Sequence, residues 1–90
     1  MKYYDWDPQK NEKLKEERDV SFEEAISAML NGNLLNTRKN QNQDKYPNQN
    51  IFIVNIHGYV FMIPFVEDFE KYFLKTIIPS RKETKKYLGK

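Results

Sequence analysis

The C-terminal part of the chain concentrates positive side chains at spacings that suit phosphate binding. Residues 71–90 carry seven Lys or Arg and one Glu, a local balance of +6, against +2 for all 90 residues. On a helix, Arg81 and Lys85 share one face and Lys82 and Lys86 share another, because residues four apart are neighbours. Arginine grips a phosphate with two parallel hydrogen bonds and stays charged at any working pH. The pattern indicates a polyanionic or acidic partner.

These cations fit cleavage of RNA without a metal. Attack of a 2′-OH on the adjacent phosphate requires a base, cations that stabilise the phosphorane, and an acid that protonates the leaving 5′-oxygen. We assign Arg81 and Lys85 as candidate catalytic cations and Lys82 and Lys86 as RNA-binding residues. Alanine at either candidate catalytic position is expected to reduce this activity and to leave the fold intact, because alanine is a good helix former. The alternative is a solvated basic tail with no special role.

Three side chains are candidates for moving the proton. His57 is the only histidine of the chain, and histidine is the side chain that titrates near neutrality. It precedes Gly58 in a predicted tight turn, where its role is alternatively geometric. Tyr87 and Glu83 lie on the predicted basic helix, where nearby cations would lower the pKa of Tyr87. The sequence leaves the choice between these groups open.

A second cationic group is predicted on the sheet. If residues 70–78 form a strand, Lys71, Phe73 and Lys75 share one face. The lysines would then line an RNA groove, and Phe73 would stack on a base. The alternative is an ordinary exposed sheet face. One His, no Cys and no Asp/Glu/His grouping at recognised spacing predict no metal site and no cofactor.

The elements that would position these residues follow from local signals. Helices are predicted from Pro8 to Arg18 and from Ser21 to Leu30, the second with an S-x-x-E capping box and an apolar stripe. Residues 2–6 are a short strand or an apolar anchor. Further strands are expected at 34–39, 51–56, 59–66 and 70–78, and a basic helix at 80–90. The expected fold is a single α+β domain, 1–90, with two N-terminal helices, an antiparallel meander of about four strands and a short C-terminal helix.

Composition and apolar pattern narrow the function classes. The N-terminal residues contain no apolar segment of the signal-peptide kind. The longest apolar stretch, 51–66, is interrupted by polar residues, glycine and proline and is too short to span a bilayer. The absence of cysteine fits a reducing compartment. We therefore expect a cytoplasmic protein that is not embedded in a membrane.

Three stretches taken in order carry a resemblance to a known family. They are Trp6-Asp7-Pro8 with Lys10, the run Val20-Ser21-Phe22-Glu23-Glu24-Ala25, and the segment from Ile77-Ile78 through Ser80-Arg81-Lys82 to Thr84-Lys85-Lys86. These resemble the W-D-P-x-K opening, the V-S-F-E-E-A helix and the I-I-S-x-R-[RK]-A-T-[RK]-[RK] ending of the BrnT family of bacterial toxins. The chain departs from that pattern at Arg18-Asp19, where family members have His-Gly, and at Glu83, where they have Ala.

The resemblance implies a concrete function. BrnT proteins resemble RelE-type ribonucleases in fold, cleave RNA and arrest growth. They are neutralised by a partner antitoxin with a ribbon-helix-helix-like DNA-binding region, and DNA is contacted only through that complex. The expected function is therefore the toxin of a type II toxin–antitoxin system. The runner-up is a non-enzymatic module that uses the same basic surface to bind nucleic acid or a partner within a regulatory complex.

Overall fold

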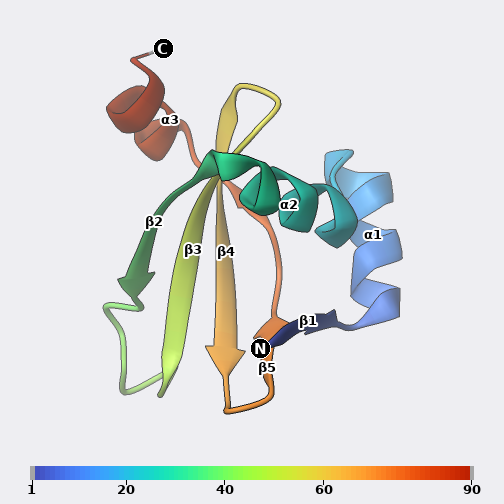
Figure 1. Cartoon of the computed structure of the whole chain (residues 1–90). Coiled ribbons are helices and arrows are strands. Elements are labelled where there is room, and N and C mark those ends of the chain that lie inside the picture. Colours follow the sequence, from blue (N-terminus) through green and yellow to red (C-terminus); the bar gives the residue numbers. More distant parts are fainter. Residues whose placement is uncertain (1, 90) are drawn as a thin grey trace.

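The computed structural model describes residues 2–89 and confirms an α+β architecture. Lys90, the predicted end of the final helix, lies outside the described residues. No helix of the described part is long and apolar enough to cross a membrane. The elements, shown in Figure 1, are β1 (Tyr3–Trp6), α1 (Pro8–Arg18), α2 (Phe22–Ala28), the π-helical turn η1 (Met29–Asn33), β2 (Leu34–Lys39), β3 (Gln49–Ile56), β4 (Tyr59–Glu67), β5 (Lys71–Leu74), β6 (Ile78–Pro79) and α3 (Arg81–Leu88).

The strands form one mixed sheet. Its order is β1-β5-β4-β3-β2, with β6 pairing with β4 as well. Antiparallel pairs join β2, β3, β4 and β5 in sequence order, which confirms the predicted meander. β1 pairs in parallel with β5, from Tyr3 opposite Lys71 to Trp6 opposite Leu74. The expectation of a purely antiparallel sheet was therefore wrong at this edge, where both helices and the first three meander strands separate the two partners in sequence.

Capping side chains set the starts of α1 and α2. Asp7 accepts a hydrogen bond from the Gln9 N–H at 2.9 Å, just before Pro8 at the first helical position. Ser21 accepts one from the Glu24 N–H at 3.1 Å. Each bond satisfies a backbone donor that the helix itself leaves unpaired, which typically contributes about 1 kcal/mol. Both helices consequently begin where the sequence predicted.

A buried asparagine holds the corner between the two helices. Asn11 is only 4% exposed. Its side-chain oxygen accepts from the Phe22 N–H at 2.8 Å, and its side-chain nitrogen donates to Glu23 at 2.7 Å. Because a buried amide destabilises the fold unless its hydrogen bonds are made, these two bonds fix α2 relative to α1.

One face of the sheet, called here the α2 face, packs against α1 and α2. Trp6 stacks on Phe22 with ring centres 5.8 Å apart, which joins β1 to α2. Leu30, predicted as the end of the buried stripe, is instead 74% exposed. The helix ends directly after Leu30, because Asn31 and Gly32 leave helical backbone geometry, with φ, ψ of −92°, 16° and 87°, 14°. The buried core contains Leu14, Val20, Phe22, Ala25, Met29, Phe52, Val54, Ile56, Ile63, Phe65, Leu74 and Ile77.

The predicted strand 70–78 is split in two. β5 ends at Leu74 and β6 begins at Ile78, and the chain between them lies beside Pro64 of β4. The Pro64 carbonyl accepts a hydrogen bond from the Lys75 N–H at 2.8 Å, so the proline nitrogen also faces this gap rather than β3. Since proline has no N–H, the ladder cannot continue here. The expected alternation therefore fails: Ile77 is fully buried, whereas Ile78 is 41% exposed.

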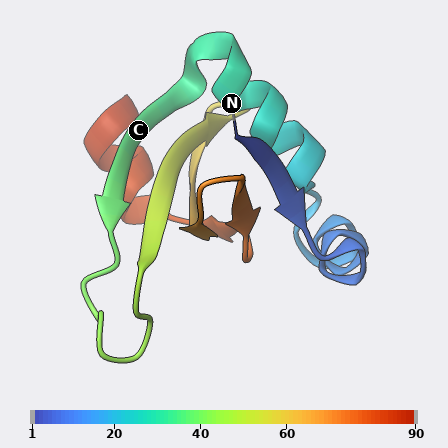
Figure 2. The ribbon, with the colours of Figure 1, turned by 60° about the horizontal axis from the view of Figure 1, so that its bottom comes forward.

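The opposite face of the sheet, called here the α3 face, carries the C-terminal helix. α3 begins at its expected cap, where Ser80 accepts from the Glu83 N–H at 3.1 Å. Thr84 accepts from the backbone N–H of Val60 at 2.9 Å, and the Ser80 N–H donates to the Val60 carbonyl at 3.0 Å. These bonds fasten the helix to β4 beside the buried Ile53 and Val60. In Figure 2, α2 lies above the sheet and α3 passes behind β2.

Candidate functional site

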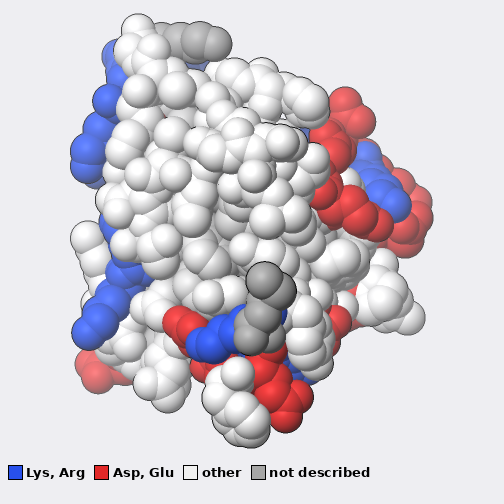
Figure 3. Space-filling model, viewed as in Figure 1, with Lys and Arg blue, Asp and Glu red and all other residues white. Residues whose placement is uncertain are grey.

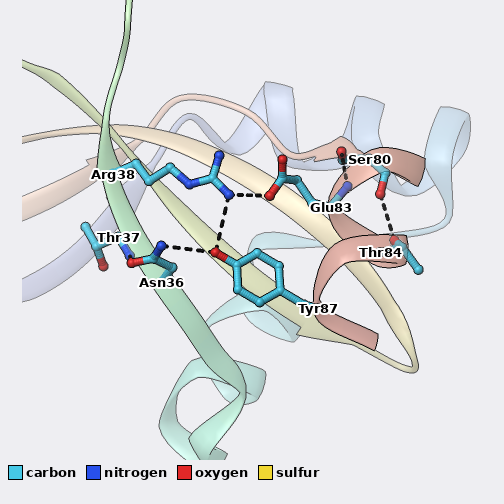
Figure 4. A network of polar contacts seen from close by, with 7 residues as sticks. All are labelled: Asn36, Thr37, Arg38, Ser80, Glu83, Thr84 and Tyr87. Carbon is cyan, nitrogen blue, oxygen red and sulfur yellow. Dashed lines mark hydrogen bonds and ion pairs between the residues drawn. The ribbon is translucent and has the colours of Figure 1, made fainter. Parts of the chain in front are cut away.

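A polar network joins β2 to α3 on the α3 face (Figure 4). The Arg38 guanidinium donates to the Glu83 carboxylate in a close ion pair and lies 3.3 Å from the Tyr87 hydroxyl. Asn36 donates its side-chain amide to the same hydroxyl at 3.0 Å. The Glu83 side chain is 7% exposed and that of Arg38 is 31% exposed. The arginine therefore remains accessible to a ligand while it holds the buried carboxylate.

A β-bulge in β2 aims the two β2 side chains at α3. Leu34 lies opposite Val54, whereas Asn36 lies opposite Ile53, the very next residue of β3. Two steps along β2 thus match one step along β3, and the side chains after the bulge change face. Without it, Asn36 and Arg38 would share the α2 face with Leu34. The bulge therefore places Arg38 in the site.

The network shifts the pKa values of its two acidic members. Hydrogen bonding to Arg38 is the main reason why the pKa of Glu83 lies below its usual value of 4.5. Hydrogen bonds from Arg38 and then Asn36 lower the pKa of Tyr87 from its usual value of 10.0, because they favour the phenolate. Glu83 therefore stays ionised and engaged, while Tyr87 is the group made more ready to give up its proton.

A polar hollow of about 290 Å³, called here the basic hollow, opens beside this network. Ile51 and Met62 form its apolar lining, and Ser80 and Glu83 belong to the α3 end. Cations and amides provide the rest of its wall: Arg38, Lys39, Lys82, Asn40 and Gln41. Three cations around a hollow that contains one carboxylate suit an anionic ligand.

A larger cavity of about 590 Å³, called here the apolar cavity, adjoins the basic hollow. Asn40, Ile51 and Met62 line both. The cavity continues along the α3 face over Pro64 to Lys75 and the residues that follow it. The two hollows therefore form one continuous depression across the sheet.

The structure divides the predicted cations of α3 into two pairs. Lys82 lines the basic hollow, and the Lys86 ammonium lies 5.5 Å from the ring centre of Tyr87. The charges of both lysines also help to lower the pKa of Glu83. Arg81 and Lys85 are exposed on the same helix, but neither lines the two hollows. Lys82, Lys86 and Tyr87 are thus gathered at the site, and the two candidate catalytic cations lie beside it.

Lys71, Phe73 and Lys75, which were predicted to share one face of the sheet, lie together on the α3 face. The ammonium groups of Lys71 and Lys75 lie 5.7 and 5.4 Å from the ring centre of Phe73. Lys71 is paired with Asp5 at 3.1 Å, whereas Lys75 lines the apolar cavity. Lys75 is therefore available to a ligand at the end of the depression farthest from Arg38 in the sheet order. The half-buried Phe73 lies next to it but lines neither hollow.

His57 lies apart from the network. It occupies the β3–β4 turn with φ of 54°, and its side chain is 83% exposed. Its ring nitrogen Nε2 lies 3.2 Å from the carboxylate of Glu24, on α2. Because α2 covers the opposite face of the sheet from α3, the structure does not bring His57 together with Arg38 and Tyr87.

We expect His57→Asn to leave any RNA cleavage by this protein unchanged. Asparagine tolerates the left-handed backbone that this turn requires, so the substitution removes the imidazole and keeps the hairpin. Loss of the exposed pair with Glu24 should change the free energy of unfolding by less than about 1 kcal/mol. Cleavage rates and urea denaturation check this, and a large loss of rate in a protein of wild-type stability would restore His57 to the site.

Lowering the pH should reduce the free energy of unfolding, partly because Glu83 becomes protonated. Its pKa is lowered by folding, so ionised Glu83 stabilises the fold above its unfolded pKa, and this contribution is lost as the pH falls through the folded value. Glu83→Gln should therefore lower the free energy of unfolding by about 1–3 kcal/mol at pH 7. The difference from wild type should vanish well below pH 4.5. Denaturant titrations of both proteins across this range check it, and a pH-independent difference would contradict it.

Charge is unevenly distributed over the surface. In Figure 3, Lys and Arg follow the edge formed by α3 and β2, Asp and Glu gather over α1, and a broad uncharged area lies between them. Within residues 2–89, no three His, Cys, Asp or Glu side chains form a group that could hold a metal ion. The functional groups at the site on the α3 face are cations, a phenol, amides and the paired Glu83 carboxylate.

Comparisons with known proteins found no match to this chain. No family model matches the chain, and neither a curated protein nor a solved structure matches it.

Proposed function

We propose that this protein is a metal-independent endoribonuclease and the toxin of a type II toxin–antitoxin pair. The observation that carries the proposal is Tyr87, whose hydroxyl accepts hydrogen bonds from Asn36 and from Arg38, the residue that also lines the basic hollow. A phenol with a lowered pKa beside a guanidinium provides a base and a phosphate ligand within a few ångströms. The resemblance of three ordered motifs to BrnT toxins supports the same function.

RNA binding would use the whole depression. Phosphates would contact Lys82 and Arg38 in the basic hollow, where arginine can bind two phosphate oxygens at once. Lys75 would contact the backbone further along the strand, and Phe73 would offer its ring to a base.

The proposed reaction balances with these groups alone. The Tyr87 phenolate takes the proton of a 2′-OH, and the 2′-oxygen forms a bond to the adjacent phosphorus. Arg38 and Lys82 stabilise the added negative charge on the phosphorane oxygens. The bond from phosphorus to the 5′-oxygen then breaks, and that oxygen receives a proton from a lysine ammonium, Lys82 or Lys86. The products are a 2′,3′-cyclic phosphate and a free 5′-OH.

A partner completes the proposal. The BrnT resemblance implies an antitoxin with a ribbon-helix-helix-like region that neutralises the protein in the cytoplasm and provides the only contact with DNA. A neighbouring small open reading frame encoding such a protein would support this pairing. Co-expression of the two chains should restore growth of the host.

One observation favours the alternative of a binding module without catalysis. Glu83 already neutralises Arg38, and this residue stands where the BrnT pattern has Ala. A guanidinium with a bound carboxylate has less charge to offer a transition state. In this reading the same depression binds RNA or an acidic partner and leaves it intact.

The deciding experiment incubates purified protein with a labelled single-stranded RNA in EDTA. Internal cleavage that leaves 2′,3′-cyclic phosphate ends is the expected result. Induced expression should in parallel arrest growth with loss of total RNA. Intact RNA and normal growth with well-folded protein would reject the enzyme and favour the binding module.

Lys82→Ala should weaken RNA binding more than Arg81→Ala does. Lys82 lines the basic hollow and Arg81 does not, although both are exposed on the same helix. Loss of one phosphate contact should reduce the slope of log affinity against log salt concentration by about 0.7 for a single strand. Fluorescence anisotropy with a non-cleavable 2′-deoxy oligonucleotide over a salt series measures this. Equal slopes for the two variants would contradict the ranking, and Lys85→Ala serves as a second control.

A further inference from the structure

The apolar cavity has a lining unlike that of the basic hollow beside it. Its walls are Ile51, Met62, Pro64 and Ile78, so most of its surface is hydrocarbon. At about 590 Å³ it has the size of a small-molecule site. Phosphate binding in the basic hollow does not explain why an apolar cavity of this size adjoins it.

Polar groups at the rim of the cavity point to a ligand with hydrogen-bonding edges. Gln49 lines it and is 9% exposed, and its side-chain oxygen accepts from Asn40 at 2.8 Å. The Gln49 side-chain nitrogen makes no hydrogen bond within residues 2–89. No fully buried side-chain nitrogen or oxygen of this part lacks a partner, so this NH₂ group is reached by solvent. It is a free donor at the edge of an apolar wall.

A tyrosine on the loop between β2 and β3 borders the same cavity. Tyr46 is 40% exposed, and the Lys45 ammonium lies 5.4 Å from its ring centre. The loop around it is held by backbone bonds from the Tyr46 N–H to Asn42 at 2.9 Å and from the Gln49 N–H to Tyr46 at 3.2 Å. A loop whose backbone is ordered before binding loses less conformational freedom when a planar ligand stacks on its tyrosine.

We propose that the apolar cavity binds one unstacked nucleobase of an RNA strand whose phosphate occupies the basic hollow. The inference rests on the proposed function and adds a base-recognition site to it. Apolar walls take the faces of the base, Tyr46 stacks on it, and the Gln49 NH₂ donates to an acceptor on its edge. Because both hollows are lined by Asn40, Ile51 and Met62, adjacent base and phosphate groups of one nucleotide reach them together.

The test uses five-residue oligonucleotides with a single abasic site at each position in turn. They carry 2′-deoxy sugars at every position, so binding is measured without cleavage. For the wild-type protein, one abasic position should weaken binding by roughly 5- to 150-fold, the range for loss of one stacked base. In Tyr46→Ala that penalty should disappear, whereas Tyr46→Phe, which keeps the ring, should retain it.

A second variant fills the cavity without removing a contact group. Thr76 lines it and has no hydrogen bond within the described part of the chain. Thr76→Phe should abolish the abasic penalty and leave the salt dependence of binding unchanged, because it removes no cation from either hollow. Circular dichroism confirms that each variant is folded.

The outcomes separate the two proposals. Equal binding of all abasic oligonucleotides to the wild type would overturn the base site and leave the ribonuclease intact. A position-specific penalty without cleavage of normal RNA would support the base site and overturn the ribonuclease. No RNA binding at all would overturn both.

Discussion

Replacing Arg38 with methionine should slow RNA cleavage by about 100- to 1,000-fold, the range for removing one preorganised donor to transition-state charge. Arg38 is the only side chain of the described network that contacts both the Tyr87 hydroxyl and the basic hollow. Its loss removes a phosphate ligand and one of the two bonds that favour the Tyr87 phenolate. Single-turnover cleavage of a short RNA at saturating protein measures the effect.

The same substitution should also destabilise the fold, so the experiment has to separate loss of catalysis from loss of stability. Methionine leaves the buried Glu83 carboxylate without its cation, at an expected cost of about 1–3 kcal/mol. The double variant Arg38→Met/Glu83→Gln replaces that charge by a neutral amide and should recover most of the stability. It should remain inactive. A double variant that cleaves at the wild-type rate would show that Arg38 acts only by holding Glu83.

Tyr87→Phe should lower cleavage by about 100- to 10,000-fold, the range for a general acid or base. Phenylalanine keeps the ring on which Lys86 lies and removes only the hydroxyl. The two donors left behind, from Asn36 and Arg38, are on residues that are not fully buried, so water can satisfy them. We therefore expect a stable, RNA-binding and nearly inactive protein.

The pH dependence of the rate distinguishes a catalytic tyrosine from a structural one. The phenolate fraction rises as the pH passes through the folded pKa of Tyr87, which lies below 10.0. The wild-type rate should therefore climb with pH and level off at a lower pH than the rate of an enzyme with an unperturbed tyrosine base, and the Tyr87→Phe variant should lose this limb. A variant that is slower at every pH by one constant factor would exclude Tyr87 as the base.

Local patterns of neighbouring residues were sufficient to predict much of the fold. Asp7, Ser21 and Ser80 are followed at short range by the N–H groups that they cap, so the helix starts were predictable. The pair His57-Gly58 separates two apolar runs, so the β3–β4 hairpin was predictable from the sequence. In the structure both residues adopt positive φ, as a tight hairpin turn requires. The basic α3 and its Tyr87 followed from the same kind of local pattern.

The features that the sequence missed depend on distant contacts. Pairing of β1 with β5 and burial of Ile77 are decided by residues far away in the chain, including Arg18, which donates to the Ile77 carbonyl at 2.5 Å. Arg38 was overlooked because regular alternation from Leu34 assigns it to the other face, and only the bulge reverses that assignment. Glu83 is the single acidic residue of the basic helix α3, and its presence was the one sequence feature that indicated a nearby cation from another element.

The bulge in β2 also bears on self-association. β2 is the last strand in the sheet order, and a free strand edge invites another chain to add to the sheet. Its irregular register, together with Arg38 and Lys39, makes such an addition unfavourable. Two of the cations that line the basic hollow thereby disfavour aggregation through the exposed edge. Variants that neutralise them are expected to form oligomers at high concentration, and RNA bound there would cover the edge and keep the protein monomeric.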